Sequence, residues 1–501
     1  MDAIIAALGL FFDLKVLAII AVASAFGLFV GAMPGLSATM ATALLVPVTF
    51  FMGPVPAIAA IVSCTAMAIF AGDIPGALLR IPGTPASAAY TDEAFRMTGK
   101  GQGEAALGAG LVFSACGGLF GVAVLILGAP VLAEFALNFS SFEYFWMALL
   151  GLTCAVFITP QSPLKGVIAL LLGLLISTVG IGASGGYPRF TFGNTELTGG
   201  VPLIPALIGM FAMPEIIRFV LSDRSQLAVV QRQIGNIFAH QWEYLRRYRL
   251  NLLRGATLGT VIGAMPGAGA DIAAWIAYAT SKKLSRESAK FGTGHPEGIV
   301  EASAANNAAL GGAWIPALVF GIPGDSITAI AIGVMFMKGI TPGPMIFLND
   351  PQMLCGVFIA FIFANLIMLP FGWIAIKSAS TLLSVPRPVL MPIILMFCIV
   401  GSFASNNTEF GVATMLVLGI IAYLMEENAF PVAPIILGMV LGPMLEENFI
   451  NSMQKTGGDP VGFVSRPIAG ILALLTILIW TSPLWLRLLR GWRLSPVRAG
   501  E

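Results

Sequence analysis

The sequence predicts an all-α polytopic membrane protein with about 12 membrane elements in two inverted-topology repeats, whose helices are broken by Pro-Gly near the membrane midplane. One observation is composition: 10% of the residues are charged and 57% are hydrophobic, whereas about 25% are charged in a soluble domain. The other is that Gly-Ala-Met-Pro-Gly occurs at 31–35 and again at 263–267, each time inside a long apolar stretch. Because lipid offers backbone groups no partners, the spanning elements are helices or a closed barrel.

The apolar runs are long enough to cross a membrane. No charged residue occurs between Val16 and Gly72, which allows two or three crossings of about 20 residues each. Such runs exclude a barrel, because its strands would alternate between apolar and polar residues. Further uncharged runs follow at 105–133, 144–164, 166–188, 352–376, 388–408 and 467–486. The last of these predicts an extra C-terminal helix.

Further Pro and Gly pairs recur in the same order in both halves. Ile74-Pro75 and Ile81-Pro82-Gly83 match Ile315-Pro316 and Ile322-Pro323-Gly324 at one constant offset. Pro202, Pro205, Gly209, Met210 and Pro214 match Pro431, Pro434, Gly438, Met439 and Pro443. Pro and Gly are common in membrane helices, but this frequency does not explain the shared register. Interrupted apolar segments at corresponding positions of two halves indicate the binding site of a secondary transporter.

These patterns divide the chain into a first transmembrane repeat (1–221), a basic linker (222–254), a second repeat (255–466) and a C-terminal helix with a basic tail (467–501). The positive-inside rule places the linker in the cytoplasm. After the first break, the loop is neutral in the first half (51–56) and charged in the second (281–298); after the second break this pattern reverses. We therefore expect equivalent loops on opposite sides of the membrane, and the extra final helix would return the tail to the cytoplasm.

Helix-capping residue types follow each break: Ser37 and Thr39, Thr84 and Ser87, Asp271, and Asp325 with Ser326. These types start helices, and a helix start presents free N–H groups and a positive dipole end that favour anions. Capping alone would explain them. If the repeats are inverted, the four starts also converge near the midplane and contact a ligand.

Two further pairs of polar residues interrupt apolar segments. Asn306 and Asn307 lie on a helix rich in small residues, where they either join helices or, with Asp271, supply oxygen ligands to a cation such as sodium. Asp73 and Arg80 flank a break, and an intramembrane charge is by default a functional candidate. Arg80 either pairs with Asp73 or holds a substrate carboxylate.

Other classes of function find no support. The net charge of +1 and the absence of a basic stripe argue against nucleic-acid binding. Five isolated cysteines and two histidines predict no transition-metal site, and no catalytic motif or cofactor motif indicates an enzyme. The acidic pairs Glu426-Glu427 and Glu446-Glu447 are expected at the ends of a short apolar segment, with no chemical role.

Several motifs together resemble one transporter family. They are Gly31-Ala-Met-Pro-Gly-Leu, Ile81-Pro-Gly, Gly263-Ala-Met-Pro-Gly-Ala-Gly-Ala, Phe291-Gly-Thr-Gly with Glu297-Gly, the stretch from Glu301 to Asn307, Gly321-Ile-Pro-Gly and Thr341-Pro-Gly-Pro. The chain is similar over almost its whole length to the large membrane subunit of the tripartite tricarboxylate transporters. The resemblance implies a bacterial inner-membrane symporter that works with a small four-helix membrane subunit and a periplasmic solute-binding protein.

The resemblance also implies uptake of a small tri- or dicarboxylate coupled to sodium, with protons as the other candidate ion. The citrate-type members have smaller uncharged residues at the positions of Asp73, Arg80 and Asp325, so a monocarboxylate or aromatic acid is equally compatible. A passive anion channel built from paired half-helices is the alternative. The expected substrate-binding residues are Gly35, Ser37, Thr39, Arg80, Gly83, Thr84, Ser87, Gly267, Gly269, Gly324, Asp325 and Ser326, and the expected cation ligands are Asn306, Asn307 and Asp271.

Overall fold

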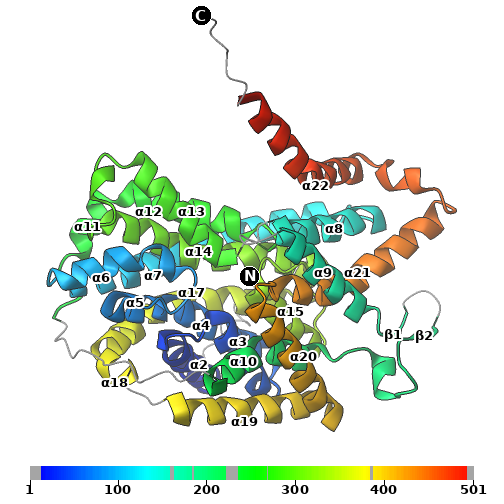
Figure 1. Cartoon of the computed structure of the whole chain (residues 1–501), viewed down its shortest axis with the longest axis horizontal. Helices are drawn as coiled ribbons and strands as arrows, with labels where there is room; N and C mark the ends of the chain where they lie inside the picture. The colour runs from blue at the N-terminus through cyan, green and yellow to red at the C-terminus, as the bar shows by residue number, and fades with distance from the viewer. Residues whose placement is uncertain are drawn as a thin grey trace, which may run out of the picture.

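The computed structural model describes residue 9 and residues 13–157, 163–182, 186–221, 235–267, 269–383 and 387–493, and these are almost all helical (Figure 1). The first half contains α2 (Leu14–Ala32), α3 (Ala38–Thr49), α4 (Pro54–Ala71), α5 (Asp73–Leu79), η1 (Ser87–Ala89), α6 (Thr91–Gly99), α7 (Gly103–Ala136), α8 (Ser141–Phe157), α9 (Pro163–Ser177), η2 (Glu196–Gly199) and α10 (Leu203–Leu221). Strands β1 (Gly180–Ile181) and β2 (Pro188–Arg189) pair antiparallel between α9 and α10.

The second half continues with α11 (Gln241–Arg247), α12 (Arg249–Gly263), α13 (Gly269–Leu284), η3 (Ser288–Lys290), α14 (Pro296–Phe320), α15 (Ser326–Met337), α16 (Ile346–Asn349), α17 (Pro351–Lys377), α18 (Ala379–Leu383), α19 (Arg387–Asn406), α20 (Glu409–Glu427), α21 (Ala433–Lys455), η4 (Pro460–Val464) and α22 (Pro467–Arg493). Among the described residues, eight segments are long and apolar enough to cross a membrane. The prediction of an all-α membrane protein with several crossings is therefore confirmed.

Each predicted break separates two helices. Gly35 (φ 91°) lies between α2 and α3, and Gly267 (φ 83°) lies between α12 and α13. At the second breaks, Arg80 (φ 61°) ends α5 and Gly321 (φ 68°) ends α14, both in the left-handed conformation. Glycine adopts this conformation without steric cost, so Arg80 is the strained member of an otherwise equivalent pair.

The helices before the breaks pack in the same way in both halves. On α2, a Cβ added to Gly27 would lie 2.2 Å from the carbonyl oxygen of Cys64 on α4. On α12, a Cβ added to Gly259 would lie 2.2 Å from the carbonyl oxygen of Ala305 on α14. In both helices, the glycine four residues further along also lies against the backbone of the facing helix. Small residues at this spacing let membrane helices approach closely. The first break of each half thus follows a helix whose backbone packs closely on its neighbour.

The helices form a core and a set of flanking helices. The core contains α2 to α7 and α12 to α17, which pack on one another across the two halves, as α14 does on α7 and α17 does on α4. The flanking helices form two groups, α10 with α19 and α20, and α8 and α9 with α21 and α22 (Figure 1). Core helices α3 and α15 contact α10, and they also contact α19 and α21 respectively. The boundary between core and flanking helices therefore follows these two short helices.

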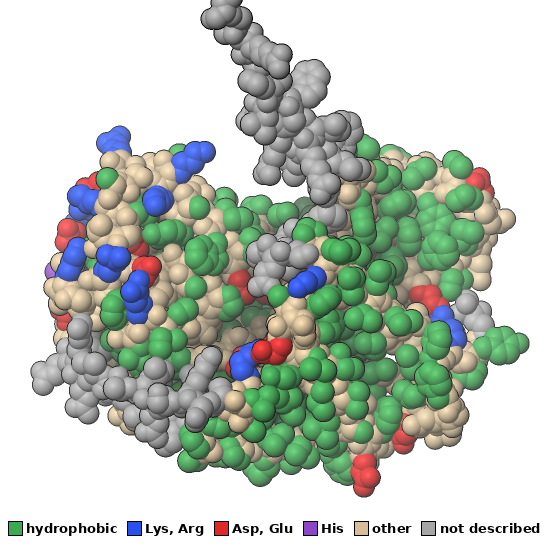
Figure 2. Space-filling view, in the orientation of Figure 1, with side chains coloured by type: hydrophobic (Ala, Val, Ile, Leu, Met, Phe, Trp, Pro, Cys, Tyr) green, Lys and Arg blue, Asp and Glu red, His purple; other side chains and the backbone are tan. Residues whose placement is uncertain are grey.

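Charged loops gather at one end of the molecule, where Lys and Arg side chains cluster over α11 to α13 (Figure 2). Glu93 on α6 accepts hydrogen bonds from the N–H groups of Gly292, Gly294 and His295, so the charged loops of the two halves lie against each other. The two loops with few charges also meet, because Lys338 Nζ donates to the carbonyl of Phe50 at 2.9 Å. The loop that follows the first break in one half thus contacts the loop that follows the second break in the other.

Candidate functional site

All four helix starts that follow the breaks line one cavity of about 470 Å³. Ser37 caps α3 and Thr39 lies in its first turn, Thr84 lies before η1, and Ser326 begins α15. The start of α13 completes the set with Gly269 and Asp271. The cavity therefore draws on both halves of the chain.

The capping residues hold these starts in place. Ser37 Oγ accepts from the N–H of Met40 at 3.1 Å. Asp325 and Thr328 form a reciprocal capping box, with bonds of 2.8 and 2.9 Å between each side chain and the other residue's backbone N–H. Thr84 and Ser87 likewise exchange side-chain to backbone bonds of 3.1 Å. Ser87 supports Thr84 from behind and does not itself line the cavity.

Asp271 joins the halves at this cavity. Its Oδ1 accepts from the N–H of Ala86 at 3.1 Å, and Trp275, one turn along α13, donates from Nε1 to the carbonyl of Pro85 at 3.2 Å. The start of α13 is therefore bound to the second break of the other half. Two further acids line the cavity, Asp325 and Glu426, and no Lys or Arg does so among the described lining residues.

The predicted glycines have backbone roles. Gly35 and Gly267 supply the left-handed turns, and Gly269 (φ 62°) packs against the Asp325 side chain. A Cβ on Gly83 would lie 2.8 Å from the carbonyl oxygen of Gly31, and one on Gly324 would lie 2.8 Å from that of Gly263. Gly267 and Gly269 line the cavity, whereas Gly35, Gly83 and Gly324 pack behind it.

The adjacent amides of α14 face different surroundings. Asn306 lines the cavity, and its Nδ2 donates to the hydroxyl of Tyr90 at 3.5 Å. Asn307 does not line the cavity and donates from Nδ2 to the carbonyl of Ala66 at 3.3 Å. Both side-chain oxygens are buried and have no hydrogen-bond partner in the described part of the chain.

Arg80 lies outside the cavity. Its Nε is 2.8 Å from Asp92 Oδ1 on α6, and the two side chains are 56% and 60% exposed. Asp73, the other predicted partner of Arg80, instead accepts from the hydroxyl of Tyr90 at 2.5 Å. The break after α5 turns the chain back, so that α6 brings Asp92 next to Arg80.

Flanking helices form one wall of the cavity, and none of the residues in this wall was predicted to lie at the site. Phe211 of α10, Glu426 at the end of α20 and the start of α21 all line the cavity. The repeated Pro and Gly pattern at 431–438 was a signal for this segment, because it matches 202–209 at the start of α10. Glu426 is held at 3.0 Å by Arg218 of α10. Glu446, expected at a helix end, lies inside α21 and forms a bidentate pair with Arg189 at 2.8 and 2.9 Å.

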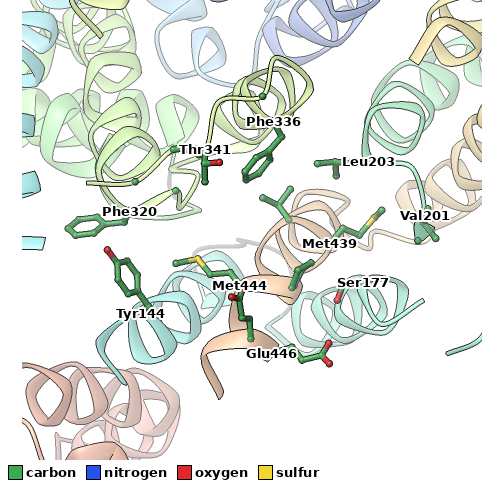
Figure 3. A pocket seen from close by; sticks show the side chains of 18 of the residues that line it. Tyr144, Ser177, Val201, Leu203, Phe320, Phe336, Thr341, Met439, Met444 and Glu446 are labelled. Atoms are coloured by element: carbon green, nitrogen blue, oxygen red, sulfur yellow. The ribbon is translucent and has the colours of Figure 1, made fainter. Parts of the chain in front are cut away.

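A second, larger cavity of about 1080 Å³ follows the same boundary between core and flanking helices (Figure 3). Phe320 and Phe336 line it from the core side, and Tyr144, Met439 and Met444 line it from α8 and α21. Helices α15 and α21 contribute to both cavities. We call the first the central cavity and the second the lateral cavity.

Nothing in the described ranges groups three or more His, Cys, Asp or Glu side chains closely enough to hold a metal ion. The five cysteines are free thiols. The polar groups of the central cavity are therefore oxygen atoms of carboxylates, amides and hydroxyls together with backbone N–H groups. Such groups suit hard cations and, at helix starts, anions.

Comparison with known proteins gives a consistent result. Over 446 residues the chain is 33% identical to an uncharacterized 52.8 kDa protein of the TAR-I ttuC' 3' region of Agrobacterium vitis, which covers 89% of this chain and 88% of that protein. It is 35% identical over 214 residues to an uncharacterized protein of the TAR-II ttuC' 3' region of the same organism, covering 43% of this chain and 88% of that protein. No solved structure matches. Residues 17–437 match the family described as the tripartite tricarboxylate transporter TctA family, and the chain therefore belongs to that family of transporter subunits.

Proposed function

We propose that this chain is the translocating subunit for cation-coupled uptake of a small carboxylate, with sodium as the coupling ion. The observation that carries the proposal is that four interrupted helix starts, two from each half, line one cavity. Membership of the TctA family supports the bacterial inner membrane as its location. It also supports a small four-helix membrane subunit and a periplasmic solute-binding protein as partners, the latter delivering the substrate.

The substrate carboxylate would bind to the helix starts. Ser37 and Ser326 lie at the starts of α3 and α15, where backbone N–H groups lack partners within the helix, and Thr84 lies three residues before η1. The positive end of each helix dipole adds attraction for an anion. Several converging starts can therefore hold a carboxylate without a lysine or arginine in the cavity.

A cation would balance the acids of the same cavity. Asp271 and Asp325 line the cavity without a basic lining residue in the part of the chain described, so a substrate carboxylate about 4 Å from either one would be opposed by about 4 kcal/mol at an effective dielectric constant of 20. A sodium ion held by Asp271 and the amide oxygen of Asn306 removes this repulsion. Asn307, which lies behind the lining, would orient α14 and support the site indirectly.

The loop contacts support an inverted arrangement of the halves. The charged loops meet at the end of the molecule where α11 lies, and the two loops with few charges meet each other through Lys338 and Phe50. We place the α11 end in the cytoplasm, because short cytoplasmic loops are enriched in Lys and Arg. Equivalent loops of the two repeats would then lie on opposite sides of the membrane.

Transport would proceed by movement of the core against the flanking helices. Both cavities lie at this boundary, and α15 begins at the central cavity and ends at the lateral cavity. The 12 residues of α15 span about 18 Å at 1.5 Å per residue. The lateral cavity would be the approach from the side opposite the linker, and sliding of the core, as in an elevator, would carry the substrate past α21.

Uptake into proteoliposomes tests the proposal against a passive anion channel, which paired half-helices could also form. The vesicles would contain this chain and its small membrane partner, with the solute-binding protein and a panel of labelled carboxylates outside. Accumulation of one acid above equilibrium, only with an inward sodium gradient, is the expected result. Equilibration that ignores the gradient would establish the channel, and absence of flux for every acid would reject the carboxylate assignment. Asp271→Asn, which removes an acid from the cavity, would be measured in the same assay. Its matched control is Asp459→Asn, which changes an acid in an exposed turn.

A further inference from the structure

A buried carboxylate lies directly behind the central cavity. Asp73 begins α5, is 6% exposed and accepts from the hydroxyl of Tyr90 at 2.5 Å through Oδ1. Its other oxygen, Oδ2, is buried and has no hydrogen-bond partner among the described residues. A Cβ added to Gly110 of α7 would lie 2.9 Å from this oxygen. The close approach of the α7 backbone leaves no room at Oδ2 for a coordinated metal ion.

Within the described chain, no lysine or arginine side chain pairs with Asp73. The elements packed on α5 are α2, α4, α6, α7 and η1, and α4 and η1 carry no charged residue. On the others, Asp92 pairs with Arg80, Glu93 accepts backbone bonds from the loop before α14, and Glu104 lies against Gly235. The remaining charged residues of these elements are Lys15, Arg96 and Glu134, and Asp13 caps α2. All four side chains are exposed.

Tyr90 connects Asp73 to the cavity. Its hydroxyl donates to Asp73 Oδ1 and accepts from Nδ2 of Asn306 at 3.5 Å. Because a hydroxyl carries one hydrogen, these two bonds fix its direction. The amide of Asn306 must then turn its nitrogen toward Tyr90, which leaves Oδ1 without a hydrogen-bond partner in the described chain. This free oxygen belongs to a residue of the cavity lining.

We propose that Asp73 is a proton-binding site linked, through Tyr90 and Asn306, to cation binding in the central cavity; this deepens the proposed function and rests on its cation site. A proton bound as a new O–H bond on Asp73 Oδ1, the oxygen that faces Tyr90, donates to the Tyr90 oxygen. The hydrogen of Tyr90 then turns to Asn306, whose amide rotates to present Oδ1 to it. The oxygen that was free for a cation is thereby occupied, and no other bond is made or broken.

The linkage has a direction. With Asp73 unprotonated, Asn306 offers its oxygen and the cavity binds the cation; with Asp73 protonated, that ligand is withdrawn. Cation affinity therefore falls as the pH falls through the titration of Asp73, by at most about tenfold per pH unit for one linked proton. By reciprocity, binding of the cation expels a proton from Asp73.

Sodium binding to the purified full-length protein tests the linkage. Labelled sodium binding would be measured from pH 5 to pH 8 for the wild type, Asp73→Asn, Tyr90→Phe and the control Asp92→Asn, which removes an exposed acid. The infrared band of a protonated carboxyl group would be followed in the same samples. Thermal unfolding would verify that each variant is folded.

The expected result is sodium affinity that falls with pH in the wild type and in Asp92→Asn. In Asp73→Asn, where the amide also donates to Tyr90, affinity should be low at every pH and the infrared band absent. Tyr90→Phe should keep the band and have a weaker pH dependence than the wild type, leaving only that of the carboxylate ligand Asp271, and it carries the test if Asp73→Asn does not fold. A pH dependence as steep as that of the wild type in both variants overturns the linkage, as does pH-independent binding by the wild type, which leaves the cation site standing. No sodium binding at any pH refutes the cation site itself and the linkage with it.

Discussion

Close packing of α12 on α14 predicts a large effect from the smallest possible substitution, Gly259→Ala. The new Cβ would lie 2.2 Å from the carbonyl oxygen of Ala305, whereas ordinary contact begins at 3.4 Å. The two helices must separate by about 1 Å, and overpacking of this kind costs about 1–3 kcal/mol. Ala305 immediately precedes Asn306, so the displacement also reaches the central cavity. We expect a lower unfolding temperature and a weakened response of uptake to sodium.

Gly128→Ala is the matched control, because Gly128 lies inside α7 with no atom within 4 Å of an added Cβ. Both substitutions gain the same helix propensity, up to about 1 kcal/mol, so the difference between them isolates the clash. The assay is thermal unfolding of the purified protein in detergent, followed by uptake in proteoliposomes. If the Gly259 variant were as stable as the Gly128 variant, the packing argument would be refuted.

Further substitutions separate structural from functional roles. Arg80→Gly removes left-handed strain of about 1–2 kcal/mol and an exposed ion pair that contributes little, so the unfolding temperature should not fall. If the carboxylate concentration for half-maximal uptake is also unchanged, Arg80 lies outside the binding site. Ser37→Ala removes the α3 cap, which costs about 1 kcal/mol, and should raise that concentration in uptake assays. Asn306→Ala should abolish the sodium response of uptake; an unchanged response would exclude it as a ligand. Arg254→Ala leaves the fully buried Glu301 without its guanidinium partner, which should cost about 3 kcal/mol or more in thermal unfolding and be largely restored by adding Glu301→Gln.

The features predicted well from the sequence are those with local causes. Ser37 and Asp325 start helices as expected, because a hydroxyl or carboxylate one residue before a helix satisfies its free N–H groups. The placement of Asn306 and Asn307 in different surroundings also follows from helix geometry, since adjacent residues point in different directions. The predicted final helix is present as α22 and extends to Arg493.

Features that depend on contacts between distant segments were not predictable. Arg80 pairs with Asp92 because the break after α5 folds α6 back, a turn that residue spacing does not reveal. Glu446 lies within α21 because a glutamate pair does not end a helix, and its partner Arg189 comes from the β1–β2 pair in the other half of the chain. Glu426 reaches the cavity only because α10 and α20 pack beside the core.

Under the proposed function, the charge of the central cavity would itself produce coupling. Asp271, Asp325 and Glu426 line a space to which no described lysine or arginine contributes, and Glu426 is paired with Arg218. The ionised Asp271 and Asp325 would leave the empty cavity negative, and a carboxylate alone would make it more so. A bound cation would offset part of this charge, so the cation-loaded cavity would accept the anion more readily. Replacing one acid by its amide should then relax the sodium requirement of carboxylate binding, whereas replacing Ser37 should weaken carboxylate binding at every sodium concentration.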